Sequence, residues 1–411
     1  MAANPMRADA TGWTVQQKNV VVAAFLGWTL DAFDFFLVVF VLKDLAADFN
    51  TSLEKTTFAL LLTLAMRPIG AFLFGRAADH YGRRPVLMFD VALYSALEFL
   101  SGFAPSLTTL LVLRALFGIA MGGEWGVGAS LTMESIPPHA RGAVSGLLQA
   151  GYPTGYLLAS VVYGTLFPVI GWRGMFMLGV LPALLVLYIR RRVPESPNWA
   201  RTPSREESTV AVVRKHWKLG LYTVLLMTLF NFFSHGTQDL YPTFLLKQHG
   251  FAPATVGTIA VVYNIGAILG GLFFGSLSER IGRRRAIITA TLLALPVVPL
   301  WTLASGAAWL AAGAFAIQFM VQGAWGVVPA HLNELSPAEA RATFPGFVYQ
   351  LGNLFASINA TLQQAIATHF GGDYRIALGA VAVTVAILIA FMCLLGIEAR
   401  GVSFARKHTS G

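Results

Sequence analysis

The 411-residue sequence has one cysteine, Cys393, and only 12% of its residues are charged. A single cysteine excludes an internal disulfide, and no metal-ligand spacing such as CxxC is present. Soluble globular proteins carry about 25% charged residues. With 56% hydrophobic residues and a mean hydropathy of +0.64, this chain needs lipid around much of its surface.

Signals for enzyme chemistry are also missing. The stretch GIAMGG at 118–123 lacks the lysine and the preceding strand of a phosphate-binding loop. Ser234 is in no nucleophile-elbow motif, and His235 is not followed by a metal-ligand partner. We therefore expect that the protein is not an enzyme and that it binds neither a cofactor nor a metal ion.

Long apolar runs separated by polar turns predict an all-α membrane protein, since a helix needs about 20 apolar residues to cross a bilayer. Twelve transmembrane helices are expected at 19–42, 56–76, 85–103, 107–131, 142–168, 173–191, 217–246, 255–277, 286–304, 307–331, 342–369 and 373–396. The resulting division is an N-terminal tail (1–18), a six-helix bundle (19–192), a linker (193–216), a second six-helix bundle (217–397) and a C-terminal tail (398–411). The polar N-terminus has no cleavable signal pattern, so the first run is expected to stay as a span.

Basic residues gather in alternate loops, most densely at 83–84, 190–192 and 283–285. The intervening loops hold only Lys43, Lys55, Arg173, Lys247 and Arg375. Because cytoplasmic loops are enriched in Lys and Arg, both termini are predicted to be cytoplasmic in a multi-pass protein of the cell inner (plasma) membrane. The net charge of +9 is then a topology signal and not a sign of nucleic-acid binding.

The two halves repeat with an offset of 200 residues. GRAADHYGRR begins at Gly75 and GSLSERIGRR at Gly275, and GGEWG at 122–126 matches QGAWG at 322–326. Internal duplication is typical of transporters whose site lies near the bilayer midplane between the halves. The same offset aligns Asp31 with Asn231 and Asp34 with Ser234, so both stretches are expected to face that cavity.

The first repeated stretch resembles the loop signature of the major facilitator superfamily, G-x-x-x-D-x-x-G-R-R/K, over a chain that is similar from about Val20 to Gly396. The resemblance implies two six-helix bundles and alternating access. It also implies a gating latch formed by Gly75, Asp79, Gly82, Arg83, Arg84, Gly275, Glu279, Arg283 and Arg284. Glu279 departs from the aspartate of the signature. The alternative is that these arginines only fix the topology.

Four polar residues, Asn231, His235, Gln238 and Asp239, share one face of the seventh helix at i, i+4, i+7 and i+8. The stretch NFFSHGTQDLYPT resembles, position for position, the signature N-x-x-S/T-H-x-S/T-Q-D-x-x-x-T of Jen-type monocarboxylate:proton symporters. The resemblance implies that this helix binds a carboxylate and handles a proton. The alternative is a polar network that only joins helices.

Arg67 is expected to anchor the substrate carboxylate, because it lies too deep in the second helix to reach water and presents a forked donor. Snorkelling to the surface is the alternative. Gln149 and Tyr152 on the fifth helix and Gln350 and Asn353 on the eleventh add neutral hydrogen-bonding groups. The last two also match the Jen-type pattern.

Proton coupling has several candidates: His235, Asp239, Asp31, Asp34, Arg114 and Glu124. Two carboxylates at i and i+3, as in Asp31 and Asp34, repel when both are ionised, so one is expected to hold a proton. Alternatively, they neutralise Arg67 or Arg114. Arg114 begins an R-x-x-x-G stretch that is common in the superfamily, and its rival role is an ion pair with Glu98 or Glu124.

The favoured function is proton-coupled uptake of short monocarboxylates, such as lactate or pyruvate, by a monomeric secondary transporter. A proton symporter for another organic acid, such as sialate, is the second reading. A non-transporting membrane sensor of the same acid is a third, and Arg67 disfavours an exporter of cationic drugs.

Overall fold

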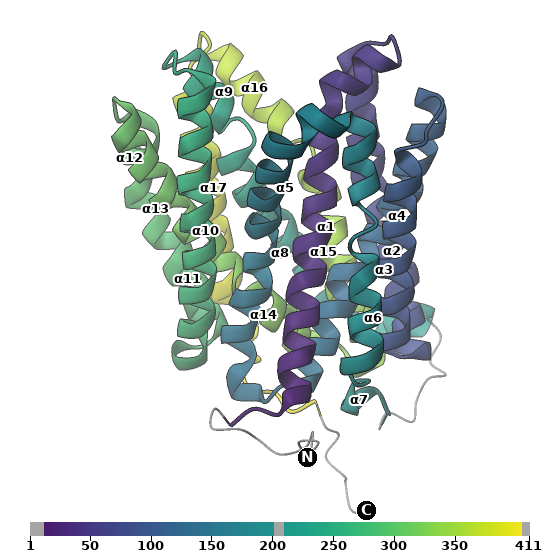
Figure 1. Cartoon of the computed structure of the whole chain (residues 1–411). Helices are drawn as coiled ribbons and strands as arrows, with labels where there is room; N and C mark the ends of the chain where they lie inside the picture. Colours follow the sequence, from purple (N-terminus) through teal and green to yellow (C-terminus); the bar gives the residue numbers. More distant parts are fainter. Residues whose placement is uncertain (1–11, 201–208, 405–411) are drawn as a thin grey trace, which may run out of the picture.

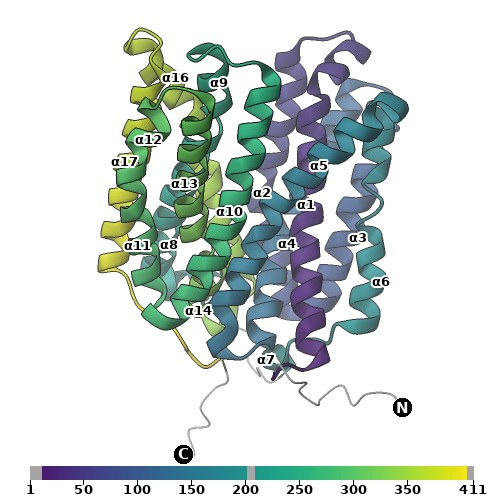
Figure 2. The ribbon, with the colours of Figure 1, turned by 60° about the vertical axis from the view of Figure 1, so that its left-hand side comes forward.

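The computed structural model describes residues 12–200 and 209–404, and every regular element in those ranges is a helix. The helices run roughly parallel and form two bundles that stand side by side (Figures 1 and 2). The predicted all-α fold is confirmed. The predicted tail residues 1–11 and 405–411 and the linker residues 201–208 lie outside the described ranges.

The first half comprises α1 (Val15–Asp48), α2 (Leu53–Tyr81), α3 (Arg83–Ser101), α4 (Leu107–Ser135), η1 (Pro138–Ala140), α5 (Arg141–Leu178), α6 (Ala183–Arg192) and α7 (Pro197–Ala200). The second half comprises α8 (Thr209–Gln238), α9 (Tyr241–Lys247), α10 (Pro253–Ile281), α11 (Arg283–Ala294), η2 (Leu295–Val297), α12 (Val298–Leu303), α13 (Ala307–Trp325), α14 (Val328–Leu335), η3 (Ala338–Ala340), α15 (Thr343–Ala356), α16 (Asn359–His369) and α17 (Tyr374–Leu395). Thus α7 and the first turns of α8 are helical inside the predicted linker.

Nine helical stretches within the described ranges are long and apolar enough to cross a membrane. The other three predicted spans are α3, which carries the buried carboxyls of Asp90 and Glu98, and two interrupted spans. The sixth begins after a turn at Gly171, whose φ is 62°, and is broken again between α5 and α6. The eleventh is broken between α15 and α16.

The bundles touch most closely near the face where α1 begins and α17 ends, which we call the tail face (Figures 1 and 2). Across the halves, α2 packs on α15 and α5 packs on α10. Glycines allow backbone contact there: a Cβ added at Gly75 would lie 2.5 Å from Thr343 Cα, and one at Gly126 would lie 2.7 Å from Gly346 Cα. Small residues of this kind let membrane helices approach closely.

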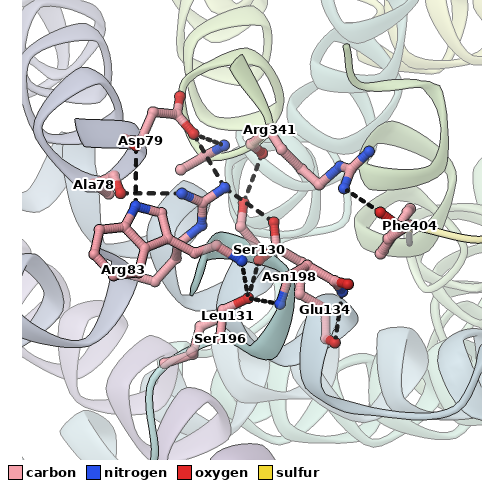
Figure 3. A network of polar contacts seen from close by, with 12 residues as sticks. Ala78, Asp79, Arg83, Ser130, Leu131, Glu134, Ser196, Asn198, Arg341 and Phe404 are labelled. Carbon is pink, nitrogen blue, oxygen red and sulfur yellow. Dashed lines mark hydrogen bonds and ion pairs between the residues drawn. The ribbon is translucent and has the colours of Figure 1, made fainter. Parts of the chain in front are cut away.

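Polar groups of the predicted latch bridge the same seam (Figure 3). The Asp79 carboxylate accepts the backbone N–H of Ala342 at 2.9 Å, and both the N–H and the hydroxyl of Thr343 at 3.0 and 2.6 Å. Asp79 thereby caps the first turn of α15 from the other half, a favourable site for a negative charge. Arg83 lies 3.1 Å from Asp79 and 3.0 Å from Glu134 and holds the carboxylate in place.

The second copy of the latch repeats this pattern with one change. Arg283 contacts Glu279 at 2.9 Å and Glu334 at 2.9 Å, as Arg83 contacts Asp79 and Glu134. The longer Glu279 side chain reaches across the seam to the backbone N–H of Gly142, at the start of α5. Both halves therefore present a carboxylate to a helix N-terminus of the other half.

Two further carboxylates fix the turns of the latch. Gly82 and Gly282 adopt φ of 111° and 99°, values that favour glycine. Glu195 then accepts the backbone N–H groups of Arg83 and Arg84, and Glu398 accepts those of Arg283 and Arg284, each at 3.0–3.2 Å. The two copies of the repeated sequence therefore form equivalent contacts in the two halves of the protein.

We predict that Gly75→Val opens the seam, because its Cβ would overlap Thr343. A cysteine at position 342 (Ala342→Cys in a Cys393→Ala background) can report this opening, because Ala342 is only 1% exposed while the seam is closed. Its labelling by a small maleimide should rise about tenfold for each ~1.4 kcal/mol lost from the closed seam.

Gly257→Val is the matched control, because a Cβ at Gly257 meets nothing within 4 Å. Labelling should stay at the level of the reporter alone. Equal labelling of the Gly75 and Gly257 variants would contradict the close packing described for this seam.

Candidate functional site

The polar face of α8 lies against α15. The His235 ring contacts two oxygens, with Nδ1 3.2 Å from Asp239 Oδ1 and Nε2 3.1 Å from Asn353 Oδ1. A neutral imidazole has one N–H, whereas the protonated ring has two. A neutral His235 therefore donates to only one of the two oxygens, and the tautomer decides which, whereas a protonated ring donates to both.

Beside these three residues lies a cavity of about 300 Å³ between the two halves. Its lining residues come from both bundles: Trp28, Phe35, Phe36, Val39, Leu64, Arg67, Gln149, Tyr152, Asn231, Ser234, His235, Gln238, Asp239, Gln322, Trp325, Tyr349 and Asn353. The side chains of His235 and Asp239 are 34% and 39% exposed. Because the seam is closed at the tail face, the cavity is shut off from that side.

All but one of the predicted substrate-binding residues line this cavity: Arg67, Gln149, Tyr152, Asn231, His235, Gln238 and Asn353. Gln350 does not. Its side chain is buried at 1% exposure, and neither its amide nitrogen nor its oxygen has a hydrogen-bond partner within residues 12–200 and 209–404. The helical face shared by Asn231, His235, Gln238 and Asp239 is present as predicted.

Arg67 enters the cavity from α2 and is 3% exposed. The nearest carboxylate is that of Asp31, 3.9 Å from Arg67 Nη2. Neither Nε nor Nη2 of Arg67 has a hydrogen-bond partner in the described part of the chain. A guanidinium offers five donors in a fork that matches a carboxylate. This one is therefore paired loosely enough to accept an anion from the cavity.

The opposite wall is a row of neutral amides and hydroxyls. Gln238 Nε2 donates to Gln318 Oε1 at 2.8 Å, and Gln322 Nε2 donates to Ser234 Oγ at 3.1 Å. Gln318 Nε2 donates in turn to Thr237 Oγ1 at 2.9 Å. These hydrogen bonds hold in place Ser234, Gln238 and Gln322, which line the cavity and can bind a small polar ligand without adding charge.

Aromatic rings form much of the remaining lining, and of these only Tyr152 was predicted from the sequence. Trp28 stacks on Tyr152 with ring centroids 5.5 Å apart, and Tyr349 lies 5.5 Å from Trp325. Trp125 and Trp325 hold equivalent places in GGEWG and QGAWG, and both contact Tyr349. The repeat could have pointed to these tryptophans as residues of the seam.

The expectation that Asp31 and Asp34 face the cavity is wrong. Both side chains are fully buried, and neither lines it. Trp28, Phe35 and Phe36 of α1 line the cavity, whereas Asp31 is covered behind this lining beside Arg67, and Asp34 is buried inside the first bundle. Asp31 and Asn231 thus occupy equivalent positions in the repeat, but only Asn231 lines the cavity.

The remaining candidates, Arg114 and Glu124, are also buried inside the first bundle. Arg114 Nη1 lies 2.6 Å from Glu98 Oε2, so Glu98 and not Glu124 is its partner. Arg114 Nη2 also donates to Ser101 Oγ at 2.7 Å. Glu124 instead points toward α1 at Gly27.

Comparisons with known proteins agree with this architecture. Residues 19–222 match the model of the "Sugar (and other) transporter" family, and residues 224–410 match that of the Major Facilitator Superfamily. A structure of the proton:xylose symporter XylE is similar with a TM-score of 0.75 and 18% identity, over 95% of this chain and 98% of that one. At this identity the likeness concerns the fold alone.

Three curated relatives are similar over most of this chain. The Escherichia coli sialic acid transporter NanX is 28% identical over 95% of this chain and 98% of its own. A probable 4-methylmuconolactone transporter of Cupriavidus pinatubonensis is 30% identical over 94% and 92%. A carboxylic acid transporter protein homolog of Saccharomyces cerevisiae is 31% identical over 87% of this chain and 62% of its own length.

The repeated bundles, the closed seam and the cavity between the halves thus agree with the family matches and with the relatives. The matched families consist of transporters, which confirms the expectation that this chain is not an enzyme. The chain is a multi-pass membrane protein that belongs to the major facilitator superfamily.

Proposed function

We propose that the protein is a secondary active transporter that takes up an organic acid anion together with a proton, with short monocarboxylates such as lactate and pyruvate as the first candidates. The observation that carries this proposal is the position of Arg67. Its guanidinium is buried at the cavity wall, loosely paired with Asp31, and faces a second half that holds His235 and Asp239.

The proposed binding step places the substrate carboxylate on the Arg67 fork. The amides of Asn231, Gln238 and Asn353 then orient a hydroxyl or carbonyl of the acid, with Gln149 and Tyr152 completing the wall. Small carboxylic acids are ionised at neutral pH, since carboxyl groups of this kind have a pKa near 4. The ligand therefore enters as an anion.

When one proton moves together with each monovalent anion, the net charge transported is zero. An anion moving inward against an inside-negative potential would meet about 2.3 kcal/mol per 100 mV, and symport with one proton removes that cost. The candidates for the carrier are the His235–Asp239 pair in the cavity and the Asp31–Asp34 pair behind Arg67.

Alternating access supplies the movement. We propose that the tail face is cytoplasmic in the cell inner membrane, because the basic loops lie there, and that a single chain forms the transport unit. The latch of Asp79 and Glu279 would then hold the cytoplasmic side closed until the loaded cavity rearranges.

The second candidate substrate is a larger acid such as sialate. The aromatic lining of the cavity, from Trp28, Tyr152, Trp325 and Tyr349, suits a sugar ring better than a two- or three-carbon acid. The similarity to the E. coli sialic acid transporter supports the same reading.

Uptake by proteoliposomes tests the substrate class directly. With an inward pH gradient, labelled lactate and pyruvate should accumulate more than labelled acetate or sialate. Uptake of sialate alone would overturn the monocarboxylate proposal and leave the symporter proposal standing. Uptake of none of these acids would count against both.

A second prediction concerns Arg67. Arg67→Lys keeps the charge but loses the fork, and hydrogen bonds to charged groups contribute about 1.5–3 kcal/mol. KM for the acid should therefore rise about 10- to 100-fold, as measured by initial uptake rates.

Arg173→Lys is the matched control, because Arg173 is 42% exposed and pairs with Asp48 away from the cavity. Its KM should stay within about twofold of the unmodified protein, as expected for an exposed ion pair. An unchanged KM for Arg67→Lys would remove Arg67 as the anchor of the carboxylate.

A further inference from the structure

The stretch that follows α17, residues 399–404, crosses the seam at the tail face, and we call it the strap. It belongs to the second half of the chain, yet its last residue, Phe404, is only 8% exposed although it lies outside every helix. Segments near a chain end are usually poorly held unless specific contacts fix them. The contacts that bury Phe404 therefore need an explanation.

The base of the strap is fixed to the second half. Glu398 accepts the backbone N–H of Arg400 at 3.1 Å, and Arg400 Nη1 donates to the carbonyl of Arg280 at 2.8 Å. The N–H of Gly401 points to Glu334 Oε1 at 3.4 Å. Because Arg280 and Glu334 both belong to the second half, the base of the strap must move with that half.

The end of the strap contacts two arginines, one from each half. Arg141, the first residue of α5, has its Cζ 3.6 Å from the centroid of the Phe404 ring, and its Nη1 donates to the carbonyl of Val402 at 2.7 Å. Arg341, just before α15, has its Cζ 4.3 Å from the same centroid, and its Nη1 donates to the carbonyl of Phe404 at 3.5 Å (Figure 3). A guanidinium this close to an aromatic ring is attracted by its π face. The strap thus interacts with both halves at once.

These two arginines are buried, with exposures of 3% for Arg141 and 9% for Arg341. Arg141 lies 3.7 Å from Glu334, and Arg341 Nε has no hydrogen-bond partner in the part of the chain that the structure describes. Buried cations need partners for their donors. The carbonyls and the ring of the strap supply such partners to a pair of positive charges that face each other across the seam.

The Phe404 ring also joins an apolar cluster that the first half builds almost alone. Its buried members are Val21, Ala24, Met133, Ile136, Val144, Leu148, Ala330 and Phe404. Only Ala330 and Phe404 come from the second half. Aromatic side chains contribute a large share of the apolar area in such contacts. Separation of the two halves would therefore pull Phe404 out of this cluster or pull the base of the strap from its own half.

We propose that residues 399–404 form a releasable strap that holds the tail face closed, and that Phe404 must leave its site on the first half before that face can open. Its site consists of Arg141 and the apolar cluster on the first half, with Arg341 on the second. The proposal rests on the alternating access proposed above. It adds a lock that is separate from the latch carboxylates Asp79 and Glu279.

Thiol labelling of the full-length protein in a Cys393→Ala background tests the strap. One reporter is Ala342→Cys, and the second is Ala71→Cys on α2. Ala71 is 2% exposed, and its Cβ lies 3.9 Å from the position of a Cβ built on Gly346 across the seam. Phe404→Ala should raise the labelling rate of both reporters about tenfold or more, because the lost ring contacts favoured the closed seam.

Val402→Ala is the matched control within the strap. The Val402 side chain is 42% exposed, and the substitution keeps the carbonyl that accepts from Arg141. Labelling should stay within about twofold, as for other exposed substitutions. Unchanged labelling in Phe404→Ala would overturn the proposal. A rise at position 342 without a rise at position 71 would also overturn it, because the change would then be local to the strap.

A cross-link tests whether the strap must be released. Phe404→Cys with Val144→Cys joins the strap to the first half, whereas Phe404→Cys with Ala330→Cys joins it to its own half within the same cluster. Each cross-linked protein is compared with its reduced form in the uptake assay. The first pair should lose uptake and regain it on reduction, because the halves can no longer separate at the tail face. The second pair should take up acid at the rate of its reduced form.

Uptake that persists in the first cross-linked pair, or that is lost in both pairs, would overturn the strap. Failure of the first pair to cross-link, by oxidation or with a short bifunctional thiol reagent, would show that the strap does not lie on α5 and would overturn it too. Labelling needs no transported acid, so an unchanged labelling rate counts against the strap alone. Absence of uptake by the unmodified protein would count against the proposed function, and labelling would still decide the strap.

Discussion

The weak pairing of Arg67 is the interaction on which the rest of the site depends. An arginine in the middle of a span costs about 2.5–3.5 kcal/mol on insertion scales, and a close carboxylate would normally offset that cost. Here the nearest one, Asp31, stays 3.9 Å away. The guanidinium is thus buried without being fully satisfied. A ligand carboxylate can supply the missing hydrogen bonds.

The closed seam separates the cavity and Arg67 from the tail face. Glycines at Gly75, Gly126 and Gly346 bring the two halves into backbone contact, and Asp79 and Glu279 place carboxylates on helix starts across the seam. These contacts consist of a few hydrogen bonds and small residues, beside the aromatic contact of Trp125 with Tyr349. Such a seam can open as a unit, which fits the exchange between two conformations that alternating access requires.

Much of the architecture could be predicted from the sequence, because apolar length, basic loops and the 200-residue repeat each report on it independently. The face of α8 that carries His235, continued by Asp239 just after the helix ends, also followed from helical periodicity. Periodicity does not say which neighbour a face meets, and for this reason Asp31 and Asp34 were placed in the cavity when they lie inside the bundle. Likewise, sequence spacing could not decide whether Glu98 or Glu124 pairs with Arg114. The packing of the helices places Glu98 beside Arg114.

The central claim is that one proton crosses with each organic anion, and simultaneous measurement of both fluxes tests it most directly. Proteoliposomes that contain a trapped pH indicator would receive labelled acid with no pH gradient, at membrane potentials set by potassium and valinomycin. The account predicts internal acidification of about one proton per anion at a rate that the potential does not change, since the loaded step carries no net charge. Anion uptake without acidification, or uptake that rises steadily as the interior is made positive, would contradict it.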